Sequence, residues 1–370
     1  MFFIFLTILF LFGYILLVAL LIYGWAKNKK FIPSNQIPTT RVSVLIAIRN
    51  EEKNIGNLLH DLTQQTFPKS LSEIIIVDDH STDRSREIVF SFTQKYPNIK
   101  LFSCWETQNG KKQALKIGLQ QANGVVIVTC DGDCRMGEKW LHSIVSYYEI
   151  HKPKMIINPV IFEDEKTFFQ KIQSLEFMSL IGATAGLAGI KKPIMCNGAN
   201  LAYEREIISE QNNFFNDKLA SGDDVFLLHH IKKTDRKKIH FFKSKEAIVT
   251  TKAQATFNAF VNQRLRWASK SKNYTDADSL IVSTLIFFSN LIFPVLLAAS
   301  LFDFFFLYLF AGAFLLKSFI DFIFLYQICG FFEKKKLLIW FFPVQFFYFS
   351  YIAIIGLLSL FIKPEWKGRK

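Results

Sequence analysis

Long apolar runs at both ends of the chain limit its fold more than any other feature. Four runs are long enough to cross a bilayer as helices: residues 1–26, 279–302, 304–328 and 337–362. Three are uncharged, and the third holds only Lys317 and Asp321, which a helix would place one turn apart for pairing. No basic segment precedes the first run and no small-residue cleavage site follows it, so we predict a retained anchor rather than a signal peptide. The pattern predicts a multi-pass membrane protein.

Lysines beside the first run predict its orientation. The segment KNKK at 27–30 follows that run, and the positive-inside rule places it in the cytoplasm. The polar block of residues 30–275 is then a cytoplasmic domain of a cell-membrane protein. The lysines at 334–336 agree with this topology. The basic tail at 363–370 does not, because three C-terminal spans would leave it outside unless the last run is re-entrant around Pro343.

Composition narrows the choice of partners. The formal net charge is +13, which favours a position against anionic lipid. A basic surface also suits nucleic acid, but no nucleic-acid motif accompanies it, so we predict no such partner. The five cysteines show no CxxC spacing and are expected to be free thiols.

Strands and helices alternate in the first half of the polar block. Four apolar segments rich in β-branched residues are predicted strands: 41–48, 74–77, 99–103 and 125–128. Helical segments follow the first three, and Ser81 or Thr82 is expected to cap the second of these helices. The alternation predicts a right-handed, doubly wound α/β sheet. Polar clusters follow the first, second and fourth strands, at the edge where such sheets bind ligands.

Two aspartates end the fourth strand. Asp131 and Asp133 are one residue apart in a turn, and carboxylate oxygens are the ligands that Mg²⁺ and Mn²⁺ prefer. A cation held there could bridge to a diphosphate. A plain Asp-Gly turn is the alternative, and these residues alone do not decide between the two.

The second half is less regular. Residues 154–162 are predicted to form one further strand. Residues 166–190 have an apolar face with Gln173 and Glu176 opposite, which fits either a core helix or a helix at the membrane interface. The stretch at about 255–270 is basic, aromatic and amphipathic. It could serve a functional site, or its Arg and Trp side chains could simply anchor the chain beside the membrane.

Five segments in this order resemble the membrane-bound family-2 glycosyltransferases. They are VSVLIAIRNEE (42–52), IIIVDDHSTD (74–83), TCDGDC (129–134), SGDD (221–224) and QRLRW (263–267). The resemblance covers about residues 41–267 together with the flanking spans. It implies the GT-A fold, a Rossmann-like nucleotide-sugar-binding domain, flanked here by transmembrane helices.

The resemblance also implies roles for individual residues. Donor and nucleotide binding falls to Glu51, Asp78, Asp79, Lys111 and Asp131. Asp131 and Asp133 form the DXD motif, with Asp133 the better candidate for direct metal contact. Asp224 matches the general base. Contacts to the diphosphate and the acceptor fall to Asp223, Gln263, Arg266 and Trp267.

Three residues depart from the common pattern. Arg49 stands where a small residue or tyrosine is frequent, His80 where glycine is frequent, and Asp223 where glutamate is frequent. None of these removes a catalytic group, but they leave the nucleotide base and the donor sugar open.

The predicted function is inverting transfer of a sugar from a UDP- or GDP-sugar to a lipid or lipid-linked acceptor at the membrane, with a divalent metal ion. A small processive polysaccharide synthase is the alternative, although four spans are few for a secretion channel. A sugar nucleotidyltransferase would need a glycine-rich loop after the first strand, and IRNEE at 48–52 has no glycine. A non-catalytic scaffold would have no use for the acidic motifs.

Overall fold

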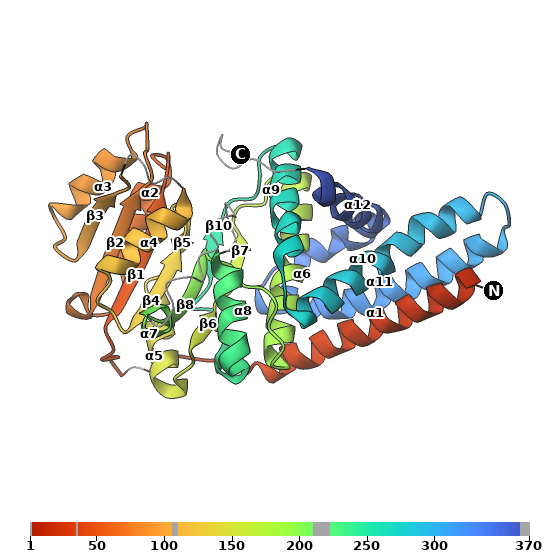
Figure 1. Cartoon of the computed structure of the whole chain (residues 1–370), viewed down its shortest axis with the longest axis horizontal. Helices are drawn as coiled ribbons and strands as arrows, with labels where there is room; N and C mark the ends of the chain where they lie inside the picture. The colour runs from red at the N-terminus through yellow and green to blue at the C-terminus, as the bar shows by residue number, and fades with distance from the viewer. Residues whose placement is uncertain (1, 35, 106–109, 210–222, 363–370) are drawn as a thin grey trace. The chain divides into compact units, whose positions relative to one another are not determined.

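A computed structural model describes residues 2–34, 36–105, 110–209 and 223–362 (Figure 1). The chain divides into two compact units. The helical unit comprises Met1–Ala26, Asp164–Ile190 and Ala253–Lys370. The sheet unit comprises Lys27–Glu163 and Lys191–Lys252.

A seven-stranded sheet forms the centre of the sheet unit, in the order β3-β2-β1-β4-β8-β6-β9. Its strands are β1 (Val42–Ile48), β2 (Ser72–Asp78), β3 (Ile99–Ser103), β4 (Val126–Cys130), β6 (Met155–Ile157), β8 (Asn200–Glu204) and β9 (Ile239–Phe241). The first four are mutually parallel and β4 is buried throughout, as its unbroken apolar run predicted. β8 runs antiparallel to β4 and β6, so the sheet is mixed rather than parallel throughout.

Helices complete the alternation in this unit. They are α2 (Ile55–Thr63), α3 (Ser85–Thr93), α4 (Lys111–Gln121), α5 (Trp140–His151), α7 (Glu206–Ser209) and α8 (Asp223–Asp235), with short 3₁₀ helices η1 (Lys69–Leu71) and η2 (Arg236–Lys238). α4 packs on β1 and β2. A Cβ at Gly118 would lie 2.0 Å from Leu45 Cδ1, so this close packing needs glycine there.

The single strand predicted over residues 154–162 is wrong. The chain breaks after β6, and β7 (Val160–Phe162) joins a separate three-stranded sheet with β5 (Arg135–Met136) and β10 (Val249–Thr251). Pro159 has no N–H and cannot continue the ladder. The Asn200 side chain fixes the break by donating to the carbonyls of Pro159 and Ala247, both at 2.8 Å.

The predicted cap of the helix after the second strand is also wrong. α3 begins at Ser85, and its N-cap Arg84 makes no side-chain cap bond. The Ser81 hydroxyl instead accepts the Asn50 N–H at 3.0 Å, and the Thr82 N–H donates to Asn50 Oδ1 at 2.8 Å. These residues therefore join the loops after β1 and β2.

The helical unit contains α1 (Phe2–Lys27), α6 (Phe168–Gly189), α9 (Phe257–Ser269), α10 (Ala277–Ala299), α11 (Phe305–Phe331) and α12 (Phe341–Phe361), with 3₁₀ segments η3 (Lys270–Asn273) and η4 (Lys335–Trp340). Four segments of the described chain are long and apolar enough to cross a membrane: Phe3–Lys27, Ala277–Ala299, Phe305–Phe331 and Lys335–Phe361. This confirms the four predicted apolar helices, while their orientation stays a prediction.

Pro343 lies in the first turn of α12, where a helix tolerates proline. The basic tail at 363–370 lies outside the described residues.

A buried ion pair lies inside this unit. Lys317 Nζ lies 2.7 Å from Asp321 Oδ2, which confirms their predicted pairing. The Tyr14 hydroxyl donates to Asp321 Oδ1 at 2.7 Å, and Gln345 Nε2 donates to Oδ2 at 2.9 Å. One carboxylate thus connects α1, α11 and α12, which lowers the cost of burying charge among apolar helices.

α6 buries two residues that the sequence placed opposite its apolar face. Gln173 is fully buried and exchanges hydrogen bonds with the backbone of Gln254, at 2.9 and 3.0 Å. Glu176 is 9% exposed. The polar side of this helix is therefore packed within its unit. Its place at a membrane interface stays a prediction.

A close backbone approach in this unit lies between α1 and α6. A Cβ added at Gly24 would lie 1.9 Å from the Gly186 carbonyl oxygen. A Cβ added at Gly186 would in turn lie 2.7 Å from the Leu21 oxygen. Backbone atoms on both sides leave no flexible group that could move aside, so both positions need glycine.

We expect Gly24→Ala to lower the thermal unfolding midpoint of the detergent-solubilised protein. Gly312→Ala is the matched control, because Gly312 lies in α11 and a Cβ there would meet nothing within 4 Å. That control should leave the midpoint unchanged or raise it, since alanine favours a helix by about 1 kcal/mol over glycine. Equal midpoints for the two variants would contradict the close packing of α1 on α6.

Candidate active site

The loops after β1 and β2 bury the first pair of predicted site residues. Asp78 ends β2 and is 4% exposed, and Asp79 is 2% exposed. Asp79 Oδ1 accepts the N–H of Gly110 at 3.1 Å, and its Oδ2 lies 3.9 Å from Arg49 Nη1. Asp79 therefore ties the loop after β2 to the start of α4.

Two residues in these loops adopt left-handed backbone conformations. Asn50 has a φ of 53° and His80 a φ of 57°. Glycine adopts this region without strain, and asparagine adopts it more readily than most other residues. The backbone thus gives a physical reason for the glycine frequent at position 80 in the resembling family. His80 Nδ1 lies 3.2 Å from Asp79 Oδ1, a local contact that glycine could not make.

The DXD turn lies against Glu51. A Cβ added at Gly132 would lie 3.0 Å from Glu51 Cγ, so glycine lets this acid approach the turn. Asp131 forms an ion pair with Lys111 at the start of α4. Asp133 Oδ2 accepts a hydrogen bond from the Thr251 hydroxyl at 2.9 Å, at the end of β10. The structure therefore brings Glu51, Lys111 and both aspartates together.

Lys111 also interacts with the acids at the start of α8. Burial alone would lower the pKa of Lys111, but the carboxylate of Asp131 outweighs it and raises that pKa. The charges of Asp223 and Asp224 act in the same direction. Lys111 therefore links the DXD turn to the second predicted acidic motif.

The neighbouring lysine holds the other acid. Lys112 Nζ lies 3.3 Å from Asp223 Oδ1, and both side chains are largely buried. Burial raises the pKa of Asp223 to about 6 against the Lys112 ammonium, which lowers it, and the charge of Asp224 raises it further. Asp223 is thus a carboxyl group that titrates nearer neutrality than an ordinary aspartate.

Backbone amides fix Asp224. Its Oδ2 accepts the Gly198 N–H at 3.0 Å, and its Oδ1 accepts the Val225 N–H at 2.9 Å. The Thr129 hydroxyl in β4 donates to the Gly198 carbonyl at 2.8 Å and ties that loop to the sheet. Each carboxylate oxygen has two acceptor positions, so Asp224 keeps room for a further proton donor.

The acidic cluster has the charge that a cation would balance. Burial raises the pKa of Asp133, and the negative charges of Asp131 and Glu51 raise it further, while the Thr251 hydrogen bond lowers it. The described residues contain no group of three or more His, Cys, Asp or Glu side chains placed to hold a metal ion. Asp131 and Asp133 fit a divalent cation as two oxygen ligands, with the remaining ligands coming from elsewhere.

The other predicted motif belongs to the helical unit. Gln263, Arg266 and Trp267 lie in α9 and are all partly buried. The Trp267 ring packs against Phe177 of α6, with ring centroids 6.0 Å apart. Gln263 Oε1 accepts a hydrogen bond from Arg264.

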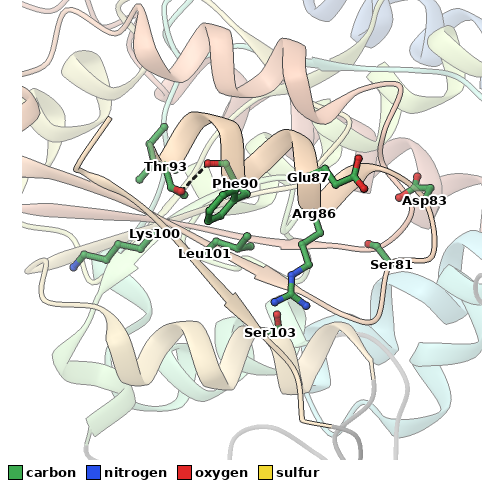
Figure 2. A pocket seen from close by; sticks show the side chains of 10 residues that line it. Ser81, Asp83, Arg86, Glu87, Phe90, Thr93, Lys100, Leu101 and Ser103 are labelled. Carbon is green, nitrogen blue, oxygen red and sulfur yellow. Dashed lines mark hydrogen bonds between the residues drawn. The ribbon is translucent and has the colours of Figure 1, made fainter. Parts of the chain in front are cut away.

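A separate cavity of about 740 Å³ lies along α3 and β3. Figure 2 shows Arg86 and Glu87 of α3, Lys100 and Leu101 of β3, and Ser81 from the preceding loop around it. None of the predicted site residues lines it. The cavity is therefore distinct from the acidic cluster.

Sequence reasoning missed three residues that hold the cluster: Lys112, Gly198 and Thr251. Lys112 could have been found from its place beside Lys111 at the start of a predicted helix. Consecutive helix residues point about 100° apart, so two adjacent lysines can pair with acids in two different loops. Gly198 acts through its backbone, and Thr251 pairs with an aspartate 118 positions away. Neither contact leaves a local pattern in the sequence.

Comparison with known proteins gives a family match for part of the chain. A model described as glycosyl transferase family 2 matches residues 43–211. The chain carries a family 2 glycosyltransferase domain. Glycosyltransferase AglE of Haloferax volcanii is 28% identical to it over 184 residues, 49% of this chain and 58% of AglE. Beta-monoglucosyldiacylglycerol synthase of Synechocystis sp. is 31% identical over 116 residues, 31% of this chain and 24% of the synthase.

The chain thus spans less than two thirds of the length of these curated relatives. The chain is also similar in fold to a solved structure. Mannosyltransferase PcManGT of Pyrobaculum calidifontis, solved in complex with GDP-Man and Mn²⁺, gives a TM-score of 0.61 at 17% identity, covering 97% of this chain and 99% of that one. The fold is of the GT-A type, a mixed α/β fold with a central sheet.

Manganese should stabilise the purified protein, because a cation relieves the repulsion among Glu51, Asp131 and Asp133. At ten times Kd, binding adds about 1.4 kcal/mol to the free energy of unfolding. We expect a higher thermal midpoint with MnCl₂, a larger rise when UDP or GDP is added, and no rise in Asp133→Asn. Glu138→Gln is the control, an exposed acid nearby whose removal should preserve the shift. If Mn²⁺ raised the thermal midpoint of Asp133→Asn as much as that of the wild type, Asp133 would not be a ligand of the cation.

Proposed function

We propose that the chain is an inverting glycosyltransferase that moves a sugar from a nucleoside diphosphate to a hydroxyl group of a membrane-associated acceptor. One observation carries the proposal. Lys111 pairs with Asp131 at the end of β4 and the adjacent Lys112 pairs with Asp223 of α8, inside a family 2 domain. A cation, a carboxylate turn and an anchored second carboxylate are the groups that such a transfer needs.

Asp224 is the general base in this proposal. Its carboxylate takes the proton of the acceptor hydroxyl while the acceptor oxygen bonds to the anomeric carbon. The bond from that carbon to the diphosphate breaks on the opposite face, and the diphosphate leaves with the electron pair. A single displacement of this kind inverts the anomeric carbon. General-base assistance contributes on the order of 10²–10⁴-fold.

The remaining groups bind the donor. Glu51, Asp78 and Asp79 are assigned to the nucleotide, and the Lys111 ammonium to the charge that develops on the diphosphate. Asp131 and Asp133 would hold Mg²⁺ or Mn²⁺, which supplies Lewis-acid stabilisation of the leaving group. The Mn²⁺ in the complex of the archaeal mannosyltransferase supports this choice of cofactor.

The acceptor is assigned to the membrane. The four candidate spans support this, as does the name of the Synechocystis relative, beta-monoglucosyldiacylglycerol synthase. Gln263, Arg266 and Trp267 would contact the diphosphate and the acceptor. In this proposal the protein sits in the cell membrane with its sheet unit in the cytoplasm, following the lysines after the first span.

A donor panel tests the function. Purified protein is incubated with membrane lipids, Mn²⁺ and each of several UDP- and GDP-sugars, and mass spectrometry identifies the glycosylated product. We expect one donor to give an inverted glycoside of a lipid. Hydrolysis alone, or no product with any donor, would contradict the proposal.

Asp224→Asn should keep donor binding and lose transfer, with kcat lower by about 10²–10⁴-fold. The amide oxygen can still accept a backbone N–H, but the side chain cannot take a proton. Asp235→Asn is the control at the other end of the same helix, where Asp235 accepts the Lys237 N–H. Near wild-type kcat in Asp224→Asn would remove this residue from the base role.

The raised pKa of Asp223 predicts an acid limit to activity. A carboxyl group with a pKa of about 6 is neutral below that pH, and Lys112 then loses its anionic partner. We expect kcat/KM to fall as the pH falls through about 6. Residual activity of Asp223→Asn should lack this step, and the same step in that variant would assign it to another group.

A further inference from the structure

A buried ion pair involves the second residue of the QRLRW segment. Arg264 of α9 and Glu176 of α6 have side chains that are 3% and 7% exposed. Arg264 Nε lies 3.0 and 3.1 Å from the two Glu176 oxygens, and Nη2 lies 2.6 Å from Oε2. This two-pronged contact fixes the plane of the guanidinium group.

The rest of that guanidinium group touches the motif itself. Its Cζ lies 4.5 Å from the ring centroid of Trp267 and 4.4 Å from that of Phe260. Its Nη1 donates to Gln263 Oε1. Arg264 therefore contacts two of the three α9 residues assigned to the diphosphate and the acceptor.

The contact with Gln263 sets the direction of an amide. A guanidinium group can only donate, so the Gln263 oxygen must face Arg264. The amide NH₂ group is then held on the other side, where it can donate to a phosphate or hydroxyl oxygen. Without Arg264 the amide could turn over and present an acceptor instead.

The two arginines of QRLRW do not share a role. Residues two apart in a helix point about 200° apart. Arg264 is 4% exposed, whereas Arg266 is only partly buried. The sequence motif thus pairs one inward arginine with one that faces away from it.

Glu176 extends the network to a third helix. The Tyr351 hydroxyl of α12 donates to Glu176 Oε1 at 2.9 Å. The Tyr351 ring stacks on Phe260 with centroids 5.7 Å apart. One carboxylate thereby connects α6, α9 and α12, all within the helical unit.

A buried ion pair is weak grounds for a stabilising role, because an apolar pair of similar volume is often equally stable. What an apolar pair cannot supply is the hydrogen bond to Gln263 and the charged surface under Trp267. We propose that Arg264 and Glu176 are positioning residues of the transfer site, which hold the Gln263 amide and the Trp267 ring in their working orientations. The inference rests on the proposed function and adds residues to its site.

The test separates position from stability. The variant Glu176→Leu/Arg264→Met replaces the pair with apolar side chains and should keep the thermal midpoint near that of the wild type. With the donor that the wild type uses, its kcat should fall about 100-fold while the donor KM changes less than about threefold. Wild-type kcat in this folded variant overturns the proposal.

Two further variants sharpen the result. Glu165→Gln is the control, since it breaks the Lys334 ion pair in the same unit without touching the motif, and it should keep kcat. Gln263→Ala should lower kcat in the wild type but add little in the apolar-pair variant, because the amide is already misplaced there. Full additivity of the two changes overturns the proposal.

Tryptophan fluorescence needs no turnover, so it still tests the inference if the wild type transfers no sugar. Arg264→Met should change the emission of the detergent-solubilised protein. The same substitution made in a Trp267→Phe background should cause no change. Identical emission of Arg264→Met and the wild type overturns the placement of Trp267, whereas an inactive wild type with the expected emission change overturns the proposed function alone.

Discussion

Two consecutive lysines hold together the acidic loops on which the site depends. Lys111 pairs with Asp131 and Lys112 with Asp223. Unlike charges 4 Å apart attract by about 4 kcal/mol at the effective dielectric near a protein surface, and like charges repel equally. The first turn of a helix is an unfavourable place for lysine, because the helix dipole is positive there. The ion pairs with Asp131 and Asp223 offset this cost.

The same helix start also contacts Asp79, in the loop after β2. Gly110 has a φ of 100° and donates its N–H to Asp79. Residues that carry a side chain rarely adopt that backbone conformation, so the turn into α4 depends on glycine. One short segment, GKK at 110–112, thus contacts the loop after β2, the loop after β4 and the start of α8. Local rules of helix design are broken where a site is assembled, as is expected of functional positions.

The sequence predicted what short-range patterns encode. Apolar runs marked the four long helices, β-branched runs marked β1 to β4, and Asp131 and Asp133 stood out because they follow a strand directly. Patterns failed where a distant partner decided the outcome. Pro159 ended a strand that its apolar neighbours favoured. The Ser81 hydroxyl, expected to cap α3, instead accepts a hydrogen bond from the Asn50 N–H. Glu176 looked like a surface residue until Arg264, 88 positions later, provided its counter-ion.

The order of segments along the chain has a consequence for synthesis. The sheet unit closes at Lys252, before any of α9 to α12 has been made. A growing chain can therefore complete the whole parallel half of the sheet and the acidic cluster while the helical unit holds only α1 and α6. Gly24 and Gly186 allow these two helices to lie backbone against backbone. This contact needs none of the later helices, so it is available to the chain before they are made.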